Sequence, residues 1–132
     1  MVQKEKDLLL KDLCERLQYG LKCSIYRVDD FGIGWRDATF NGIIRHDIGY
    51  EFYFDDYVCV DSINKVKPYL FPMSSMTDEQ RKEYIDLCTE DTVGGIYYLS
   101  PDSANWLDAH HFDYRGLIPM GLAIDATGKN IY

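Results

Sequence analysis

The chain has 132 residues, of which 46% are hydrophobic and 27% are charged. This length and balance predict one domain, 1–132, with its own core, and they exclude a generally disordered chain. Acidic side chains outnumber basic ones by 22 to 14, which gives a net charge of -8 and argues against direct binding to nucleic acid. A basic protein partner, or solubility alone, fits this charge better.

The cysteines lie far apart in the sequence and form no CxxC pair; they are Cys14, Cys23, Cys59 and Cys88. This spacing predicts reduced, buried thiols. The amino terminus, MVQKEKD, lacks the apolar stretch of a secretory signal. Since no apolar run approaches the roughly 20 residues that span a bilayer, we expect a cytoplasmic protein without membrane contact. The sequence assigns no cofactor.

The first predicted element is a helix over residues 4–19. Leu9, Leu13 and Leu17 recur at intervals of four, which is the spacing of one helix face. Gly20 follows where a left-handed residue often ends a helix. We expect this helix to dock on a sheet.

Three strand-like runs follow, over residues 21–26, 38–45 and 50–58, with turns at 29–34 and 46–49. They predict an antiparallel meander. Gly42 marks a bulge or a close approach of two backbones. The side chains expected on the inward face of the last two runs are Ala38, Phe40, Ile44, Tyr50, Phe52, Phe54 and Val58.

The middle of the chain, KPYLFPMSSMTDEQ, has two prolines and an apolar stretch between them. Residues 61–65 predict a single helical turn capped by Asp61 or Ser62. Pro68 and Pro72 force extended conformations on the residues before them. Because the stretch between them is apolar, we expect it to cover the open edge or mouth of the sheet.

The last third predicts two helices and one or two short strands. Thr77 caps a helix over residues 78–90, and Gln80 completes its capping box. Ser100 and Pro101 begin a second helix, which Gly116 is expected to end. Short strands are predicted at 96–99 and 122–125. The fold class is therefore α+β: a small antiparallel sheet, of three meander strands plus one or two more, as an open sheet or a partly open barrel packed with about three helices.

The densest polar cluster is DAHHFDYRG, with Asp108, His110, His111 and Asp113. On a helix, Asp108 and His111 share a face, so the carboxylate is placed to orient the imidazole for metal binding or proton transfer. Neither HExxH nor another recognised ligand spacing is present. The alternative is that His111 is a helix carboxy-terminal residue held by Asp108 or by a carbonyl. His46 and Asp47 form a second pair, which a hairpin turn explains equally well.

Tyrosines and aspartates also alternate around the predicted sheet, and they predict either a surface for a basic protein or ordinary cross-strand packing, which is the stronger explanation. The residues are Tyr19, Tyr26, Tyr50, Tyr53, Tyr57 and Tyr69, with Asp29, Asp30, Asp55, Asp56 and Asp61.

Three segments carry a resemblance to a known family: DLCERLQYGLKC, the IxxVKPYLFPMSSMT segment at 63–77, and WLDAHHFDYRGLIPMGLAI at 106–124. Together they resemble a family of small proteins from gut Bacteroidetes and from their phages and prophages. The family usually has Arg where this chain has Phe71. The resemblance implies a mobile-element protein with an accessory or host-interaction role, and it assigns no activity to any residue.

Three functional hypotheses follow. The first is a non-enzymatic interaction domain that binds another protein through its sheet edge and through Tyr69 and Phe71. The second is a small metal-assisted hydrolase built on the cluster from Asp108 to Asp113. The third is an acidic mimic of nucleic acid that captures a DNA-binding protein.

Overall fold

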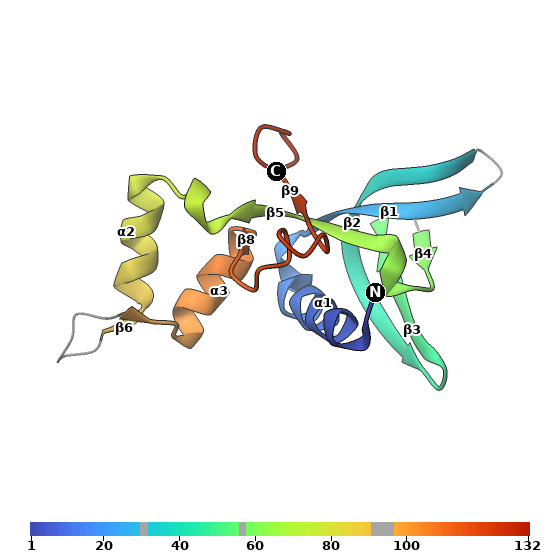
Figure 1. The fold of residues 1–132 in the computed structure, drawn as a ribbon, viewed down its shortest axis with the longest axis horizontal. Coiled ribbons are helices and arrows are strands. Elements are labelled where there is room, and N and C mark those ends of the chain that lie inside the picture. Colours follow the sequence, from blue (N-terminus) through green and yellow to red (C-terminus); the bar gives the residue numbers. More distant parts are fainter. Residues whose placement is uncertain (30–31, 56–57, 91–96) are drawn as a thin grey trace.

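The computed structural model describes residues 1–29, 32–55, 58–90 and 97–132. Within these ranges, three α-helices accompany a mostly antiparallel open sheet, which confirms the α+β class. The sheet is open and does not close into a barrel. Figure 1 shows an elongated molecule, with α2 at one end and the β1–β2 hairpin at the other. The helices are α1 (Gln3–Arg16), α2 (Asp78–Leu87) and α3 (Pro101–Ala109).

The main sheet has the strand order β4-β3-β2-β1-β5-β8, and β9 also pairs with β5. Its strands are β1 (Lys22–Asp29), β2 (Gly32–His46), β3 (Gly49–Phe54), β4 (Val58–Val60), β5 (Val66–Pro72), β8 (Phe112–Asp113) and β9 (Ile124–Asp125). The run from β1 to β4 is the predicted antiparallel meander. Both β8 and β9 pair with β5 in parallel. A separate two-stranded sheet joins β6 (Thr89–Glu90) to β7 (Tyr97–Tyr98).

The core lies between α1 and one face of the meander. Leu9 and Leu13, at the predicted spacing of four, are completely buried, as is Leu21 just after the helix. A 3-10 turn (Leu17–Tyr19) continues α1, and Gly20 adopts the left-handed conformation with φ 65. The predicted first helix and its glycine cap are therefore confirmed. The sheet supplies Cys23, Ile25, Phe40, Phe52, Phe54, Val58, Val60 and Val66 to the same core.

A β-bulge in β2 changes which side chains face this core. Phe40 pairs with Phe54 and Gly42 with Tyr53, so Asn41 is the extra residue. The bulge predicted at Gly42 is present, and it reverses the alternation after it. Ile43 therefore packs against the core, whereas Ile44, predicted to face inward, is 48% exposed. Tyr50, also predicted to face inward, is exposed at the end of the strand.

The apolar segment between the prolines belongs to strand β5, which covers the edge of the meander at β1 as a paired strand. Its first half pairs with β1, with Val66 opposite Ile25 and Pro68 opposite Cys23. Its second half pairs with β9 and β8. In Figure 1, β5 runs from beside β1 toward α2. The single helical turn before it, η3 (Ile63–Lys65), is capped by the Ser62 side chain, as predicted.

The predicted starts of both later helices are confirmed. Thr77 and Gln80 close the start of α2, and Ser100 starts α3 with Pro101 at its first position. Both helices end earlier than predicted. α2 stops at Leu87 instead of 90, and α3 stops at Ala109, well before Gly116. His111 has φ 63, and this left-handed conformation turns the chain out of the helix into β8.

The short strands are also found, within narrower limits. The run predicted at 96–99 is β7 over Tyr97–Tyr98, and residue 96 lies outside the described residues; the run at 122–125 is β9. The turn predicted at 29–34 is strand at both ends, and residues 30–31 lie outside the described residues. All four cysteines are free thiols, but Cys14 and Cys59 are exposed and only Cys23 is buried. No helix among the described residues is long and apolar enough to cross a membrane.

Candidate interaction site

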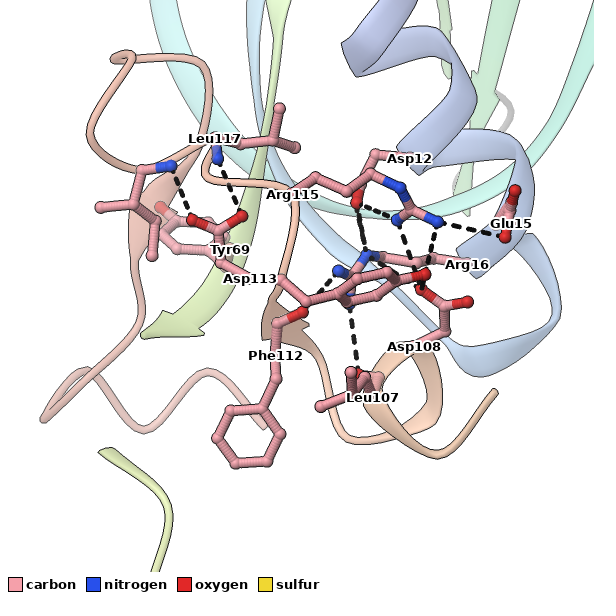
Figure 2. Close-up of polar contacts among 12 residues, drawn as sticks. Asp12, Glu15, Arg16, Tyr69, Leu107, Asp108, Phe112, Asp113, Arg115 and Leu117 are labelled. Atoms are coloured by element: carbon pink, nitrogen blue, oxygen red, sulfur yellow. Dashed lines mark hydrogen bonds and ion pairs between the residues drawn. The ribbon is translucent and has the colours of Figure 1, made fainter. Parts of the chain in front are cut away.

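The predicted polar cluster does not form a single site. Asp108 is 1% exposed, and its carboxylate lies beside Arg16 and Arg115 (Figure 2). One of its carboxylate oxygens lies 3.7 Å from Arg16 Nε and 3.5 Å from Arg115 Nη1. The hydroxyl of Tyr114 donates to the same oxygen at 3.0 Å. Burial raises the pKa of the Asp108 carboxyl, and the nearby Arg16 opposes that shift.

Asp108 belongs to a buried ion network that joins α1 to the chain after α3. Arg16 Nε donates to both carboxylate oxygens of Asp12 at 3.0 Å, and neither side chain is exposed. Arg115 Nη1 donates to Asp12 at 2.6 Å, and its Nη2 lies 3.1 Å from Glu15. Arg16 Nη2 also donates to the Phe112 carbonyl at 2.5 Å. Because its charges and donors are paired with one another, this network has the arrangement of a buried structural ion network.

The two histidines have separate environments. His110 is exposed, its ring stacks on Trp106 with centroids 4.1 Å apart, and its Nδ1 lies 2.8 Å from the Trp106 carbonyl. His111 is 9% exposed and stacks on Tyr132 with centroids 3.8 Å apart. Its Nδ1 has no hydrogen-bond partner among the described residues. Burial, with a smaller effect of Arg16, lowers the pKa of His111 to about 4, so its ring is neutral at pH 7.

Asp113 has a local backbone role. Its two carboxylate oxygens accept hydrogen bonds from the amides of Leu117 and Ile118 at 2.8 and 2.9 Å. Each of the four residues of the cluster therefore has its own set of contacts. Among the described residues, no group of three His, Cys, Asp or Glu side chains lies close enough together to hold a metal. The geometry gives no support to the hydrolase hypothesis.

Tyr69 and Phe71, the residues predicted to bind a partner, are packing residues. Tyr69 is 8% exposed, and its hydroxyl donates to Asp37 at 2.5 Å. Phe71 is half-buried between the rings of Phe112 and Tyr132, at centroid distances of 6.2 and 5.8 Å. Strand pairing of β5 explains the position of Tyr69, whereas Phe71 also lines a hollow of about 230 Å³ together with His110, a second residue of the predicted site.

The exposed surface lies instead on the β1–β2 hairpin, which extends past its neighbouring strands (Figure 1). On one side, β5 pairs with β1 only as far as Ile25. On the other side, β3 pairs with β2 only as far as Phe40. Residues 26–29 and 32–37 therefore form a two-stranded arm, in which Tyr26 is opposite Trp35 and Val28 is opposite Ile33.

The face of the arm that is turned away from the core is apolar. Val28 and Ile33 are 69% and 70% exposed, and Trp35 is 46% exposed. The Tyr26 and Trp35 rings meet edge to face with centroids 5.6 Å apart, and Lys67 Nζ lies 5.4 Å from the Trp35 ring centroid. The sequence signal for this face is the alternation of apolar residues on both sides of DDFGIG. It is missed when that stretch is interpreted as a turn.

Two hollows lie beside the arm. The first, of about 360 Å³, is lined by Tyr26, Arg27, Val28, Glu51, Cys59, Val60, Asp61 and Lys65. The second, of about 580 Å³, is lined by His46, Asp47, Ile48, Gly49, Tyr50, Glu51 and Asp61. Glu51 and Asp61 line both hollows, so the two adjoin.

Glu51 is the polar centre of this region. It accepts a hydrogen bond from the Tyr53 hydroxyl at 2.5 Å and one from the Cys59 thiol at 3.5 Å. His46 Nε2 lies 2.8 Å from its other oxygen, so His46 pairs with Glu51 and not with the predicted Asp47. The Tyr53 hydrogen bond is the main cause that lowers the pKa of Glu51. Glu51 is therefore ionised at neutral pH.

The predicted alternation of tyrosines and aspartates is only partly described, because Tyr57, Asp30 and Asp56 lie outside the described residues. Comparison with models of protein families, with curated proteins and with solved structures gives no match for this chain.

Proposed function

We propose that the protein is a non-enzymatic protein-binding domain and that the apolar face of the arm is its main contact surface. One observation carries the proposal: Val28, Ile33 and Trp35 are exposed together on one face of two paired strands. Single exposed apolar residues are common, whereas a contiguous group is typical of a contact surface. The resemblance to phage and prophage proteins supports an accessory role in a mobile element.

The energetics favour a covered state of this face. Full burial of a side chain such as Val28 or Ile33 contributes about 1.5–3 kcal/mol. Trp35 adds a large ring that already contacts the Tyr26 ring and the Lys67 ammonium group. A partner that covers the arm therefore gains several anchors without ordering them first.

Site-specific crosslinking tests the proposal. A photo-crosslinking amino acid is placed at Ile33 and, as a matched control, at Glu79, which is exposed on α2 at the far end of the molecule. In an extract of the native host we expect covalent adducts from position 33 only, and we expect Val28→Ser with Trp35→Ser to abolish them. Equal labelling at both positions, or adducts that survive the double substitution, would contradict the proposal.

The charge of -8 supports a second proposal, in which the domain is an acidic mimic that captures a DNA-binding protein. Duplex DNA added before crosslinking separates the two. If DNA displaces the captured protein, the mimic is favoured; if the adducts persist, the apolar contact is favoured.

A further inference from the structure

One edge of the arm has unpaired backbone groups. β5 leaves β1 at Ile25, and no strand in the described part of the chain pairs with residues 26–29 on that side. β4 also has only one partner among the described strands, namely β3. Such edges present a row of unpaired N–H and C=O groups, which is a template for an added strand.

The first hollow lies between these two edges. Tyr26 and Val28 of β1 line one side, and Cys59 and Val60 of β4 line the other. Its volume of about 360 Å³ is within the range of pockets that hold ligands. An extended segment that pairs with β1 points every second side chain toward the same face, so one or two of its side chains would enter this hollow.

The second hollow indicates what charge such a segment carries. Asp47, Glu51 and Asp61 line it together with Ile48 and Tyr50. Ile48 is fully exposed, so it offers an apolar wall for the stem of a lysine or arginine whose cationic head meets the carboxylates.

Two cations line the first hollow and oppose this attraction, but both have partners. Lys65 Nζ lies 2.9 Å from Asp61, so these two charges offset each other, and Arg27 also has an interaction partner. A second copy of this chain is a poor occupant, because each copy carries a net charge of -8 and like charges repel. A cationic partner has no such penalty.

We propose that the free edge of β1 binds an extended cationic segment of another protein, which pairs with residues 26–28 and places a lysine or arginine beside Asp47 and Glu51. This inference rests on the proposed protein-binding function and names its partner class. The apolar face of the arm and this edge are adjacent, so one partner can cover both.

Synthetic peptides provide the test. The probe is a nine-residue peptide of alternating lysine and valine. One control has N-methyl groups on alternate residues, which removes backbone donors along one edge, and the other has glutamate in place of lysine. In an amide NMR titration we expect the probe to shift and protect the amides of Tyr26 and Val28. N-methylation should weaken binding at least tenfold, and the glutamate peptide should not bind.

Charge variants give a second readout. Each exposed ion pair contributes about 0.2–1 kcal/mol, so Asp47→Asn with Glu51→Gln should weaken the probe by roughly fivefold at low salt and have little effect at 1 M salt. The matched control is Glu79→Gln with Asp86→Asn, which removes two exposed carboxylates from α2 and should leave the affinity unchanged.

Three results would overturn the inference: equal binding of the glutamate peptide, equal weakening by the control variant, or shifts confined to Ile33 and Trp35. Sedimentation of the peptide-free protein as a dimer through the arm would do so as well. If the peptides fail while crosslinks at Ile33 persist, only the cationic strand is wrong. If the peptides do not bind and position 33 gives no crosslinks, the proposed function is wrong as well.

Discussion

Replacing His111 tests whether a neutral imidazole in the folded protein makes stability depend on pH. The change is His111→Asn, which removes the titrating group. Asparagine is also one of the few residues that tolerate the left-handed conformation that this position adopts, with φ 63. The control is His110→Asn, one residue away and exposed.

The magnitude follows from the pKa of His111, which falls from 6.5 to about 4 in the folded protein. Above pH 6.5 the ring is neutral in both states, so it causes no loss of stability. As the pH falls from 6.5 toward 4, the unfolded chain takes up a proton that the folded chain does not. The wild type should therefore lose about 2 kcal/mol between pH 7 and pH 5 relative to His111→Asn.

Urea unfolding at pH 7, 6 and 5 measures this difference for the wild type and both variants. Carboxylates titrate in all three proteins, so their contribution largely cancels in the comparison. We expect the free energy of unfolding of the wild type to fall toward that of His111→Asn as the pH decreases, and His110→Asn to follow the wild type. Parallel pH profiles for all three proteins would refute a buried, neutral His111.

Further substitutions test the ion network, a helix cap and two glycines. Arg16→Met should cost about 3 kcal/mol in thermal unfolding, because it leaves the buried Asp12 with Arg115 as its remaining cationic partner, and adding Asp12→Leu should recover part of that loss. Thr77→Ala should weaken the start of α2 by about 1 kcal/mol; faster amide exchange should be confined to α2, none of whose side chains is buried. Gly20→Ala should cost about 1 kcal/mol, since its φ is 65, whereas Gly42→Ala should be nearly neutral, because an added Cβ meets nothing within 4 Å.

Local signals in the sequence predict the element starts well. Thr77 and Ser100 are helix caps whose side chains bond to amides within three residues, so a short window contains the whole interaction. The leucine spacing of α1 and the Gly20 cap are local in the same sense. The α+β class and the meander follow from these signals and from strand alternation.

Structural features that depend on residues far away in the sequence cannot be predicted from a short window of residues. β5 pairs in parallel with β8 and β9, strands of two residues each that come more than forty positions later, so its apolar residues look like a separate cover. The helix end at Ala109 depends on His111, a residue type that rarely takes a positive φ. The prediction that Ile44 faces inward is wrong because one extra residue in the bulge reverses the alternation.

The candidate site shows the same limit. His110 and His111 are adjacent in sequence, yet one ring is exposed and the other is buried against Tyr132. Asp108 finds its partner Arg16 on a helix 92 positions earlier. The apolar face of the arm exists only because β1 and β2 pair beyond the ends of their neighbours, and no local pattern reports the length of a neighbouring strand.

The ion network has a consequence for the order in which the chain is made. Arg16 emerges early from the ribosome, but the carbonyls it donates to, at Leu107 and Phe112, lie 91 and 96 positions later. Until those residues are synthesised, α1 carries a charged side chain with only Asp12 beside it and cannot bury that side without a large penalty. We therefore expect nascent chains that stop before Arg115 to expose α1 and recruit chaperones, and the native state to form only after Arg115 has emerged.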